Sequence, residues 1–465
     1  MGSTLSYSWR FTSPFRRIKN FFNRNHTELN DDFVHNFALF NTLSKNKHMS
    51  DIVPRTINEL LDLYDTQFLN GSYRLILGRI PDQEGFNYYL NRIKSGVRKE
   101  VILSQLRLSD EGRLKSVNLV GLDDVILRSK LLKIPFIGKA LSCCVTIKKK
   151  HPLKKKQSDI VCIIPYYNGS KFIERALISI YKQTVLPDEV VVVDDGSRVD
   201  ERDFLIELNK KYSFHLVHKI NGGQGSARNT GVAESSSKYI CFLDQDDFYL
   251  PRHNEILLKG IPADEPDFGW VYGDLIEADG DGLVKKMDLI KECATHPKRD
   301  LVTMLREDMF VLPSASLINR RAFEDVGGFD EQFTGYEDDD LFLRLYRKGW
   351  GNTFIDKSVY TLCMHNESTS YTIKMARSRF RYLKKMANLY PDDVSKKFYY
   401  FRDLLIPRFG PQIIEDAIKA KETASKDRDE LFDILNQYYE MVQINGTASD
   451  SQILDLKNLV ESICE

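Results

Sequence analysis

The sequence lacks the signatures of several large protein classes. No uninterrupted apolar stretch in its 465 residues is long enough to span a bilayer, and the first 22 residues do not have the pattern of a signal peptide. No G-x-x-x-x-G-K-[ST] occurs, so we do not expect phosphates to be held as in a P-loop NTPase. No G-x-G-x-x-G follows the first strand predicted below, which argues against a dinucleotide oxidoreductase.

Net charge and cysteine spacing exclude further classes. The 66 Lys and Arg residues balance the 66 Asp and Glu residues, which argues against a general polyanion binder and against nucleic acid as a partner. The seven cysteines show no C-x-x-C or Cys/His metal spacing, so we expect neither a disulfide framework nor a zinc site. Together these absences predict a cytoplasmic protein.

Composition and periodicity change several times along the chain, and the length favours two or three domains. We predict five segments: an irregular N-terminal segment 1–50, a helical module 51–127, a basic and apolar linker 128–157, an α/β domain 158–374, and a C-terminal helical region 375–465.

The helical module is predicted from apolar residues at three- and four-residue spacing between residues 57 and 68. Its pattern Y-R-x-x-L-G-R-x-P-D-x-x-G, from Tyr73 to Gly85, resembles a family of short bacterial helical domains of unknown function that are similar to phycobilisome linker domains. The resemblance implies a docking or assembly module without chemistry. We interpret Arg74, Arg79 and Asp82 as residues that hold the helix–turn–helix together.

The linker is strongly basic. Residues 128–156 contain ten Lys or Arg residues and no Asp or Glu, around the apolar run L-L-K-I-P-F-I-G-K-A-L. Two interpretations stay open: a connection with a solvated basic end, or a basic amphipathic element that contacts an anionic membrane at the inner face of the cell membrane.

From residue 158 the pattern is typical of an α/β fold. Short apolar runs rich in β-branched residues alternate with amphipathic stretches, for example 201–211 and 224–234. This alternation predicts a Rossmann-like, mostly parallel sheet with helices on both faces. Ligands of such sheets bind beyond the carboxyl ends of the strands.

Polar motifs follow the predicted strands at that edge. They are Pro165–Asn168, Asp194–Ser197, Asn221–Gly223 and Asp244–Asp247. Several carboxylates at one edge repel one another unless a cation offsets them, and Mg²⁺ prefers one or two carboxylates together with phosphate oxygens and water. We therefore expect Mn²⁺ or Mg²⁺ bridged to a nucleotide diphosphate.

Residues 159–371 resemble a family 2 glycosyltransferase with the A-type nucleotide-sugar-binding fold. The resemblance rests on four stretches in order and register: VCIIPYYNGSKFIERALISIYKQT, EVVVVDDGS, GGQGSARNTGVAESSSKYICFLDQDD and GYEDDDLFLRLYRKG. It implies a nucleotide site at Pro165, Tyr167, Asn168, Asp195, Arg228, Asn229 and Asp244, with Asp194 supporting a turn. It implies Asp246 as the direct metal ligand, with Asp244 and His365 as the other candidates.

A second acidic cluster begins at residue 337. The family's Glu-Asp motif falls on Glu337 and Asp338, and the resemblance implies that Asp338 is the base that takes the acceptor's proton. Because three aspartates stand in a row, Asp339 stays open as the base. We interpret Asp340 and Asp247 as helix-capping residues.

The resemblance implies a metal-dependent, inverting hexosyl- or N-acetylhexosaminyltransferase that uses a nucleotide sugar, with UDP the expected nucleotide, in bacterial surface polysaccharide synthesis. A glycan, lipid-linked or protein acceptor is open, and so is a homo-oligomer. The alternatives are a non-catalytic nucleotide-sugar-binding scaffold and a nucleotidyltransferase. For the C-terminal region, packing under the catalytic domain, self-association and membrane contact all stay open.

Overall fold

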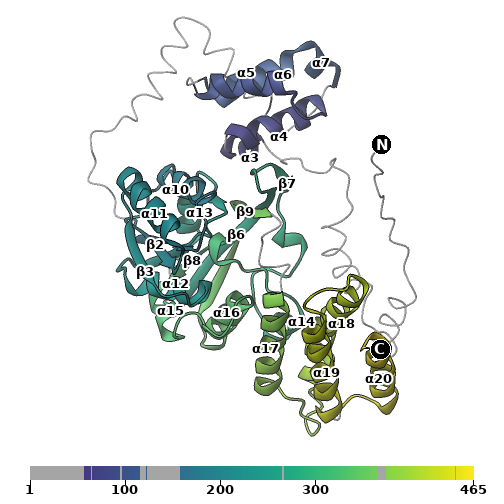
Figure 1. The fold of residues 1–465 in the computed structure, drawn as a ribbon. Coiled ribbons are helices and arrows are strands. Elements are labelled where there is room, and N and C mark those ends of the chain that lie inside the picture. The colour runs from purple at the N-terminus through teal and green to yellow at the C-terminus, as the bar shows by residue number, and fades with distance from the viewer. Residues whose placement is uncertain are drawn as a thin grey trace, which may run out of the picture.

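The computed structural model describes residues 57–63, 65–94, 97–115, 122, 158–263, 266–364, 373–445 and 447–464. Three parts are seen in Figure 1: a group of short helices, a sheet with helices around it, and a C-terminal group of longer helices. Within the described ranges, no helix is both long and apolar enough to cross a bilayer.

Among the described residues, the first part contains five short helices. They are α3 (Ile57–Asp62), α4 (Asp65–Leu77), α5 (Gln83–Lys94), α6 (Lys99–Leu108) and α7 (Asp110–Lys115). Their apolar faces share a core that also takes in Leu250, Ile276 and Val284 of the sheet domain, and the helices lie over the β7 end of that domain (Figure 1). The helical module is therefore docked onto the sheet domain.

The turn between α4 and α5 confirms part of the interpretation of the Y-R-x-x-L-G-R motif. Arg79 donates to Glu111 through Nε at 2.7 Å and through Nη2 at 3.0 Å. The Gly85 amide donates to Asp82 Oδ1 at 2.7 Å, and Arg79 pairs with Asp82 at 3.3 Å. Arg74 differs, because its Nη2 is buried without a hydrogen-bond partner among the described residues. Arg79 and Asp82 thus hold the turn.

The second part is built on one sheet. Its strands are β1 (Ile160–Tyr166), β2 (Glu189–Asp195), β3 (His215–Lys219), β4 (Tyr239–Phe242), β5 (Phe248–Tyr249), β6 (Phe268–Asp279), β7 (Val284–Lys286), β8 (Ser316–Asn319) and β9 (Gly351–Met364). The order is β3-β2-β1-β4-β8-β6-β9-β5, with β7 on β6. The α/β fold is confirmed.

Half of the sheet has the arrangement that the sequence predicts. β1 to β4 are parallel, and β1 is buried along its whole length, as a strand covered on both faces must be. β8 runs antiparallel to β4 and β6, and β5 runs antiparallel to β9. The sheet is therefore mixed, and its parallel half carries the predicted motifs.

Helices cover this sheet on both faces (Figure 1). They are α10 (Ile173–Tyr181), α11 (Val199–Tyr212), α12 (Gln224–Ala233), α13 (His253–Lys259), α14 (Leu301–Arg306), α15 (Arg320–Asp325) and α16 (Glu337–Arg347), with 3₁₀ turns at Ile290–Glu292 and Pro313–Ala315. Right-handed crossovers in the order β3-β2-β1-β4 put α10 and α11 on one face and α12 on the other. The start of α12 thereby comes to the carboxyl ends of the strands.

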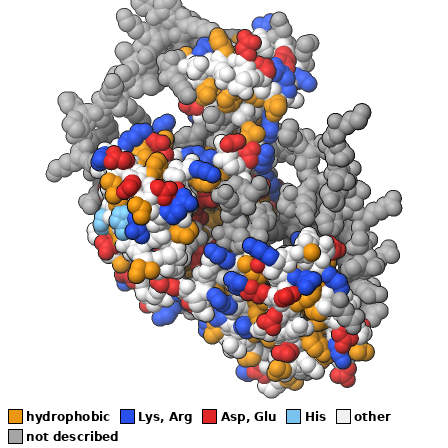
Figure 2. Space-filling view, viewed as in Figure 1, with side chains coloured by type: hydrophobic (Ala, Val, Ile, Leu, Met, Phe, Trp, Pro, Cys, Tyr) orange, Lys and Arg blue, Asp and Glu red, His pale blue; other side chains and the backbone are white. Residues whose placement is uncertain are grey.

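The third part packs against the sheet domain. It contains α17 (Ile373–Leu389), a π-helix (Phe401–Leu405), α18 (Ile406–Glu422), α19 (Arg428–Asn445) and α20 (Asp450–Cys464). Its buried residues, such as Leu405, Leu435 and Tyr438, belong to the same hydrophobic core as the strands. Of the three roles left open by the sequence, packing against the α/β domain is the one seen. Acidic and basic side chains are interspersed over the exposed face of both parts (Figure 2).

Gly231 tests the packing of α12 on the sheet. A Cβ at Gly231 would lie 2.4 Å from Ile163 Cγ2 and 3.3 Å from Val193 Cγ2, so Gly231→Ala should lower the free energy of unfolding by about 1–3 kcal/mol, as overpacking does. Gly225→Ala on the same helix is the control, since its Cβ would meet only Phe329 Cβ at 3.4 Å. Denaturant unfolding measures both, and equal stability of the two variants would contradict this packing.

Candidate active site

The carboxyl ends of β1, β2 and β4 meet at one edge of the sheet, where the predicted motifs lie. At the end of β1, Pro165 pairs with Val193 inside the sheet, and the ring of Tyr167 is half exposed. Gln245 fixes the Tyr167 backbone, because its Oε1 accepts from the Tyr167 amide at 2.9 Å and its Nε2 donates to the Tyr167 carbonyl at 3.2 Å. The main chain that carries the exposed ring is thus fixed by Gln245.

Asn168 shapes the loop beside Tyr167. It has a positive φ of 47°, which asparagine tolerates better than most residues. Its amide donates to Ser197 Oγ at 3.0 Å, and its Oδ1 accepts from the Arg198 amide at 3.0 Å. Asn168 therefore joins the loops that follow β1 and β2.

The two aspartates at the end of β2 have different partners. Asp194 is buried and accepts from the Ser197 amide at 2.9 Å, which confirms its role in supporting the turn. Asp195 accepts from Lys219 Nζ at 2.7 Å and from the amides of Gly222 and Gly223 at 2.9 and 2.8 Å. Asp195 thereby sets the loop before α12.

Arg228 links the two acidic clusters. Its side chain is 3% exposed, and it pairs with Asp244 through Nη2 at 2.6 Å and with Glu337 through Nη1 at 3.2 Å. Gln224 Nε2 donates to the same Asp244 oxygen at 2.7 Å, and the Gly335 amide donates to Glu337 Oε2 at 2.7 Å. One buried cation therefore holds the end of β4 next to the start of α16.

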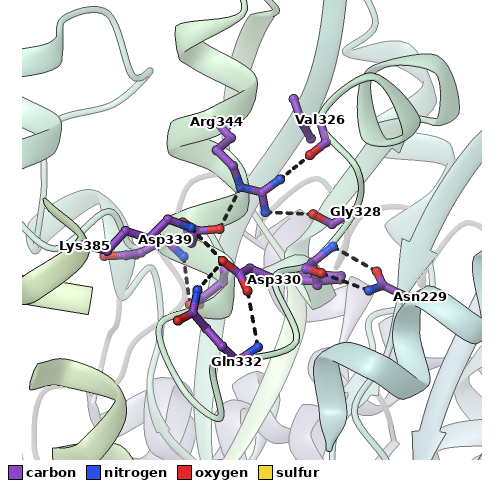
Figure 3. Close-up of polar contacts among 11 residues, drawn as sticks. Asn229, Val326, Gly328, Asp330, Gln332, Asp339, Arg344 and Lys385 are labelled. Carbon is purple, nitrogen blue, oxygen red and sulfur yellow. Dashed lines mark hydrogen bonds and ion pairs between the residues drawn. The ribbon is translucent and has the colours of Figure 1, made fainter. Parts of the chain in front are cut away.

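Asn229 is engaged with the loop before α16. Its Nδ2 donates to the Phe329 carbonyl at 2.9 Å and to Glu331 Oε1 at 3.0 Å, and its Oδ1 accepts from the Phe329 amide at 2.9 Å. Figure 3 shows this loop held by Asn229 of α12, Arg344 of α16 and Lys385 of α17. Because both hydrogens of its amide are used here, Asn229 positions the loop, and its predicted contact with a nucleotide stays a prediction.

The three aspartates after β4 have different surroundings. Asp244 and Asp246 are partly exposed, whereas Asp247 is buried and accepts from Tyr360 Oη and, at 2.7 Å, from the Cys363 amide. Burial and the nearby charges of Asp246 and Asp244 raise the pKa of Asp247 well above its usual range. Asp247 anchors β9.

The interpretation of Asp247 as a helix cap is wrong. The next helix, α13, begins at His253 with Arg252 in the N-cap position. The Asp247 carboxylate is bound by β9 instead, 113 and 116 residues further along the chain. The following Pro251 suggested a helix start, whereas the long-range partners could not be seen in the sequence.

A divalent cation fits the part of this edge formed by Asp244 and Asp246. The described residues contain no group of three or more His, Cys, Asp or Glu that could hold a metal by themselves. Two partly exposed carboxylates are nevertheless the set that Mg²⁺ accepts when phosphate oxygens and water complete its shell. After burial, the charges of Asp246 and Asp244 contribute to the raised pKa of Asp247, so these carboxylates lie close enough to repel one another. His365 lies outside the described residues, and its predicted role as a ligand stays a prediction.

The four acidic residues at the start of α16 are held in different ways. Glu337 pairs with Arg228, Asp339 with Arg408 of α18, and Asp340 with Arg344 at 2.7 Å and Lys385 at 2.5 Å. Asp338 Oδ1 accepts from the Asp339 amide at 2.9 Å. Asp338 is thus the residue of the four that forms no ion pair within the described ranges.

The surroundings of Asp338 disfavour its charged form. Burial, and then the charges of Asp339 and Glu337, raise the pKa of Asp338 well above its usual range. A carboxylate with a raised pKa holds a proton more strongly and is better suited to remove one near neutral pH. The interpretation of Asp340 as a helix cap is wrong. Tyr336, with φ 63°, is the N-cap of α16, and Asp340 lies inside the first turn of the helix.

Sequence reasoning missed three residues of this site. Gln245 lies inside the D-Q-D-D motif, and its position between two carboxylates of the predicted site could have identified it as a site residue. Arg408 and Lys385 come from the C-terminal helices and bind Asp339 and Asp340. Their sequence separations from these partners, 69 and 45 residues, leave no local pattern that could have identified them.

Comparison with known families agrees with this geometry. The family described as "Glycosyl transferase family 2" matches residues 161–327, which include β1, β2, β4 and the carboxylates after β4. These residues form a family 2 glycosyltransferase domain. A domain of unknown function, DUF4214, matches residues 56–113, which cover the N-terminal helices. The glycosyltransferase domain is therefore accompanied by the helical module that the sequence predicts.

Relatives of the glycosyltransferase domain include proteins with assigned names. Chondroitin synthase of Escherichia coli is 32% identical over 213 residues, 44% of this chain and 29% of that protein. An uncharacterized glycosyltransferase of Rickettsia conorii is 28% identical over 207 residues, 44% of this chain and 34% of that protein. The chain thus spans about a third of the length of these two relatives. TarS 1–349 of S. aureus is 19% identical, with a TM-score of 0.47 over 65% of this chain and 90% of that chain.

The Arg228 link gives a test of the site's stability. Arg228→Met leaves Asp244 and Glu337 without their shared cation, so the free energy of unfolding should fall by about 3–5 kcal/mol, as when one partner of a buried ion pair is removed. Arg198→Met is the control, because Arg198 is 67% exposed in its pair with Asp200 and such pairs contribute about 1 kcal/mol or less. Urea unfolding of both variants at pH 7 measures the difference, and similar losses would contradict the linking role of Arg228.

Proposed function

We propose that this chain transfers a sugar from a nucleotide-sugar donor to a hydroxyl group of an acceptor. The observation that carries this proposal is the pair of contacts made by Arg228, which hold Asp244 at the donor edge beside Glu337, the neighbour of the candidate base. The proposed donor carboxylates and the proposed base belong to segments about 90 residues apart in the sequence, and the shared contacts of Arg228 with Asp244 and Glu337 support their acting together. Membership of residues 161–327 in glycosyl transferase family 2 supports the same activity.

The nucleotide lies, in this proposal, between the loops after β1 and β2. The exposed Tyr167 ring offers a surface on which a base can stack, and the Asp195 carboxylate accepts from the N–H of a pyrimidine. UDP is the nucleotide that we propose. The ribose and phosphates then extend past Asp244 toward the start of α12, where Arg228 and Asn229 lie.

The cation in this proposal is Mn²⁺ or Mg²⁺, held by Asp246 and Asp244 with His365 as the further candidate ligand. A bound cation offsets the charge that develops on the departing nucleoside diphosphate. Asp246 contributes its partly exposed carboxylate, and Arg228 keeps Asp244 in position through the 2.6 Å contact. The protein thereby supplies a fixed edge for the diphosphate.

Asp338 is the base in this proposal, with Glu337 positioned beside it by Arg228. The Asp338 carboxylate takes the proton from the acceptor hydroxyl as that oxygen attacks the anomeric carbon from the side opposite the diphosphate. The C–O bond to the diphosphate breaks and the configuration inverts. The raised pKa of Asp338, caused by burial and by neighbouring Asp339 and Glu337, supports this role.

Two rival functions make different predictions. A nucleotidyltransferase also uses carboxylate-bound metal, but it releases pyrophosphate, whereas a glycosyltransferase releases a nucleoside diphosphate. A non-catalytic scaffold would bind the donor and release neither. The intact pair Asp246 and Asp338 favours the catalytic reading over the scaffold.

For the acceptor and the cellular context, we propose classes only. We propose a glycan, lipid-linked or protein acceptor in the synthesis of a bacterial surface polysaccharide; the E. coli relative is named as a chondroitin synthase. The basic segment 128–156 lies outside the described residues, so its proposed contact with the inner face of the cell membrane stays a prediction. The five segment boundaries, a cytoplasmic location and a homo-oligomer stay predictions too.

The metal proposal is tested with Asp246→Ala. Removing this carboxylate should abolish transfer and the Mn²⁺-dependent part of donor binding while circular dichroism stays unchanged. Asp203→Ala is the control, since Asp203 is an exposed aspartate of α11. Calorimetric titration of UDP with and without Mn²⁺ gives a readout besides activity. Undiminished transfer by Asp246→Ala would refute the assignment.

The base is tested with Asp338→Asn, which keeps the size of the side chain and removes its basicity. Donor binding should stay close to wild type, while transfer should fall about 100-fold or more, the scale usual for general-base catalysis. Transfer by wild type should be lost on acidification at a pH well above about 3.9, the ordinary aspartate value, because the pKa of Asp338 is raised. A larger loss in Asp339→Asn than in Asp338→Asn would move the base to Asp339.

A further inference from the structure

An arginine of the C-terminal helices reaches the start of α16. The Arg408 side chain, on α18, is 3% exposed and pairs with Asp339. It also contacts Asp308 at 3.1 Å and donates to the Met304 carbonyl at 3.1 Å. The rings of Tyr382 and Phe409 lie against its guanidinium. These contacts fix both the position and the charge of Arg408.

This contact gives adjacent aspartates different surroundings. Asp339 is buried against Arg408, and Glu337 is paired with Arg228. Asp338 stands between two ion-paired carboxylates and is itself in no ion pair among the residues that the structure describes. The neighbouring charges thus divide the acidic cluster into fixed ions and one carboxylate available for proton transfer.

We propose that Arg408 is a positioning residue that keeps Asp339 ionised beside Asp338, so that Asp338 and not Asp339 accepts the acceptor's proton. This inference rests on the proposed function and deepens it. It makes α18, which lies outside the matched family 2 segment 161–327, a part of the catalytic arrangement. Arg408 touches neither of the proposed substrates in this scheme and acts through Asp339.

The charged groups around Asp338 and Asp339 explain how the two carboxylates influence each other. Asp338 faces Asp339 and Glu337 on its own helix and Arg228 of α12. Asp339 faces Arg408 of α18, Asp308 after α14 and Lys298 before α14; burial raises the pKa of Asp339 to about 6, while Arg408 and Lys298 act in the opposite direction. Without Arg408 the Asp339 carboxylate would take up a proton at neutral pH, and its charge would no longer raise the pKa of Asp338.

The test compares the pH dependence of kcat/KM for transfer in the wild type and in four variants. In Arg408→Met and in Asp339→Asn the acidic limb should move to lower pH by about one unit, because each variant removes the charge beside Asp338. The double variant should show the same shift as either single one, since both act on the same charge. Arg408→Lys should keep the wild-type limb, because it keeps the cation.

Arg379→Met is the matched control. Arg379 is another largely buried arginine of this region, and it pairs with Asp416 between α17 and α18 without contacting Asp339. Its loss should weaken the packing of the C-terminal helices and leave the acidic limb in place. Additive shifts in the double variant, or an equal shift in Arg379→Met, would show that Arg408 acts only through packing and would overturn the inference.

Unfolding measurements check the same charge without activity. The raised folded pKa of Asp339 means that its ionisation lowers stability as pH rises, and in Arg408→Met that loss should be larger and extend to higher pH. The urea midpoint of Arg408→Met should therefore fall further below wild type at about pH 8 than at about pH 5. In the double variant Arg408→Met/Asp339→Asn, the difference in urea midpoint from wild type should no longer increase between about pH 5 and about pH 8. A difference that still increases with pH would overturn the inference.

The outcomes separate the two proposals. If the wild-type protein releases no nucleoside diphosphate with any donor in a nucleotide-sugar screen, the proposed function fails, and the inference fails with it. If the wild type transfers sugar but the limbs of Arg408→Met and Asp339→Asn do not coincide, the inference alone fails.

Discussion

The site depends on one buried cation. Arg228 lies between Asp244, which follows β4, and Glu337, which begins α16. Its guanidinium also lies against the rings of Phe242 and Phe329, so its position is set by packing as well as by charge. Burying an arginine costs desolvation free energy, and the attraction of neighbouring anions offsets that cost. These two ion pairs therefore couple the edge of the sheet after β4 to the start of α16.

The parallel half of the sheet could be predicted because its signals are local. The apolar runs before Tyr166, Asp195 and Asp244 set strands that end within two residues of these positions, and the intervening stretches formed α10, α11 and α12. The rest of the sheet depends on long-range pairings, such as the parallel pairing of β6 with β9, which joins residues about 80 apart. Such pairings are fixed by packing and leave no periodicity in the sequence.

In the candidate site, too, some features follow from local sequence signals and others only from long-range contacts. The motif positions that follow each strand converge on one edge, because parallel strands bring their carboxyl ends together. What each aspartate does was harder to predict, since adjacent residues with the same side chain have different partners. Asp246 and Asp247 differ in burial, and Asp247 is held by Tyr360 and Cys363 of β9. Their roles follow from tertiary contacts that a single sequence does not contain.

The C-terminal helices contribute to the charge balance at the start of α16. Arg408 and Lys385 balance the charges of Asp339 and Asp340, and both lie beyond residue 374, the predicted end of the α/β domain. A fragment that ends there would keep every family motif described above and lose half of the cations that neutralise α16. Asp339 would then lose its pair with Arg408, and Asp340 would keep only its pair with Arg344. The part of the chain that balances the charges of α16 therefore extends beyond the last sequence motif.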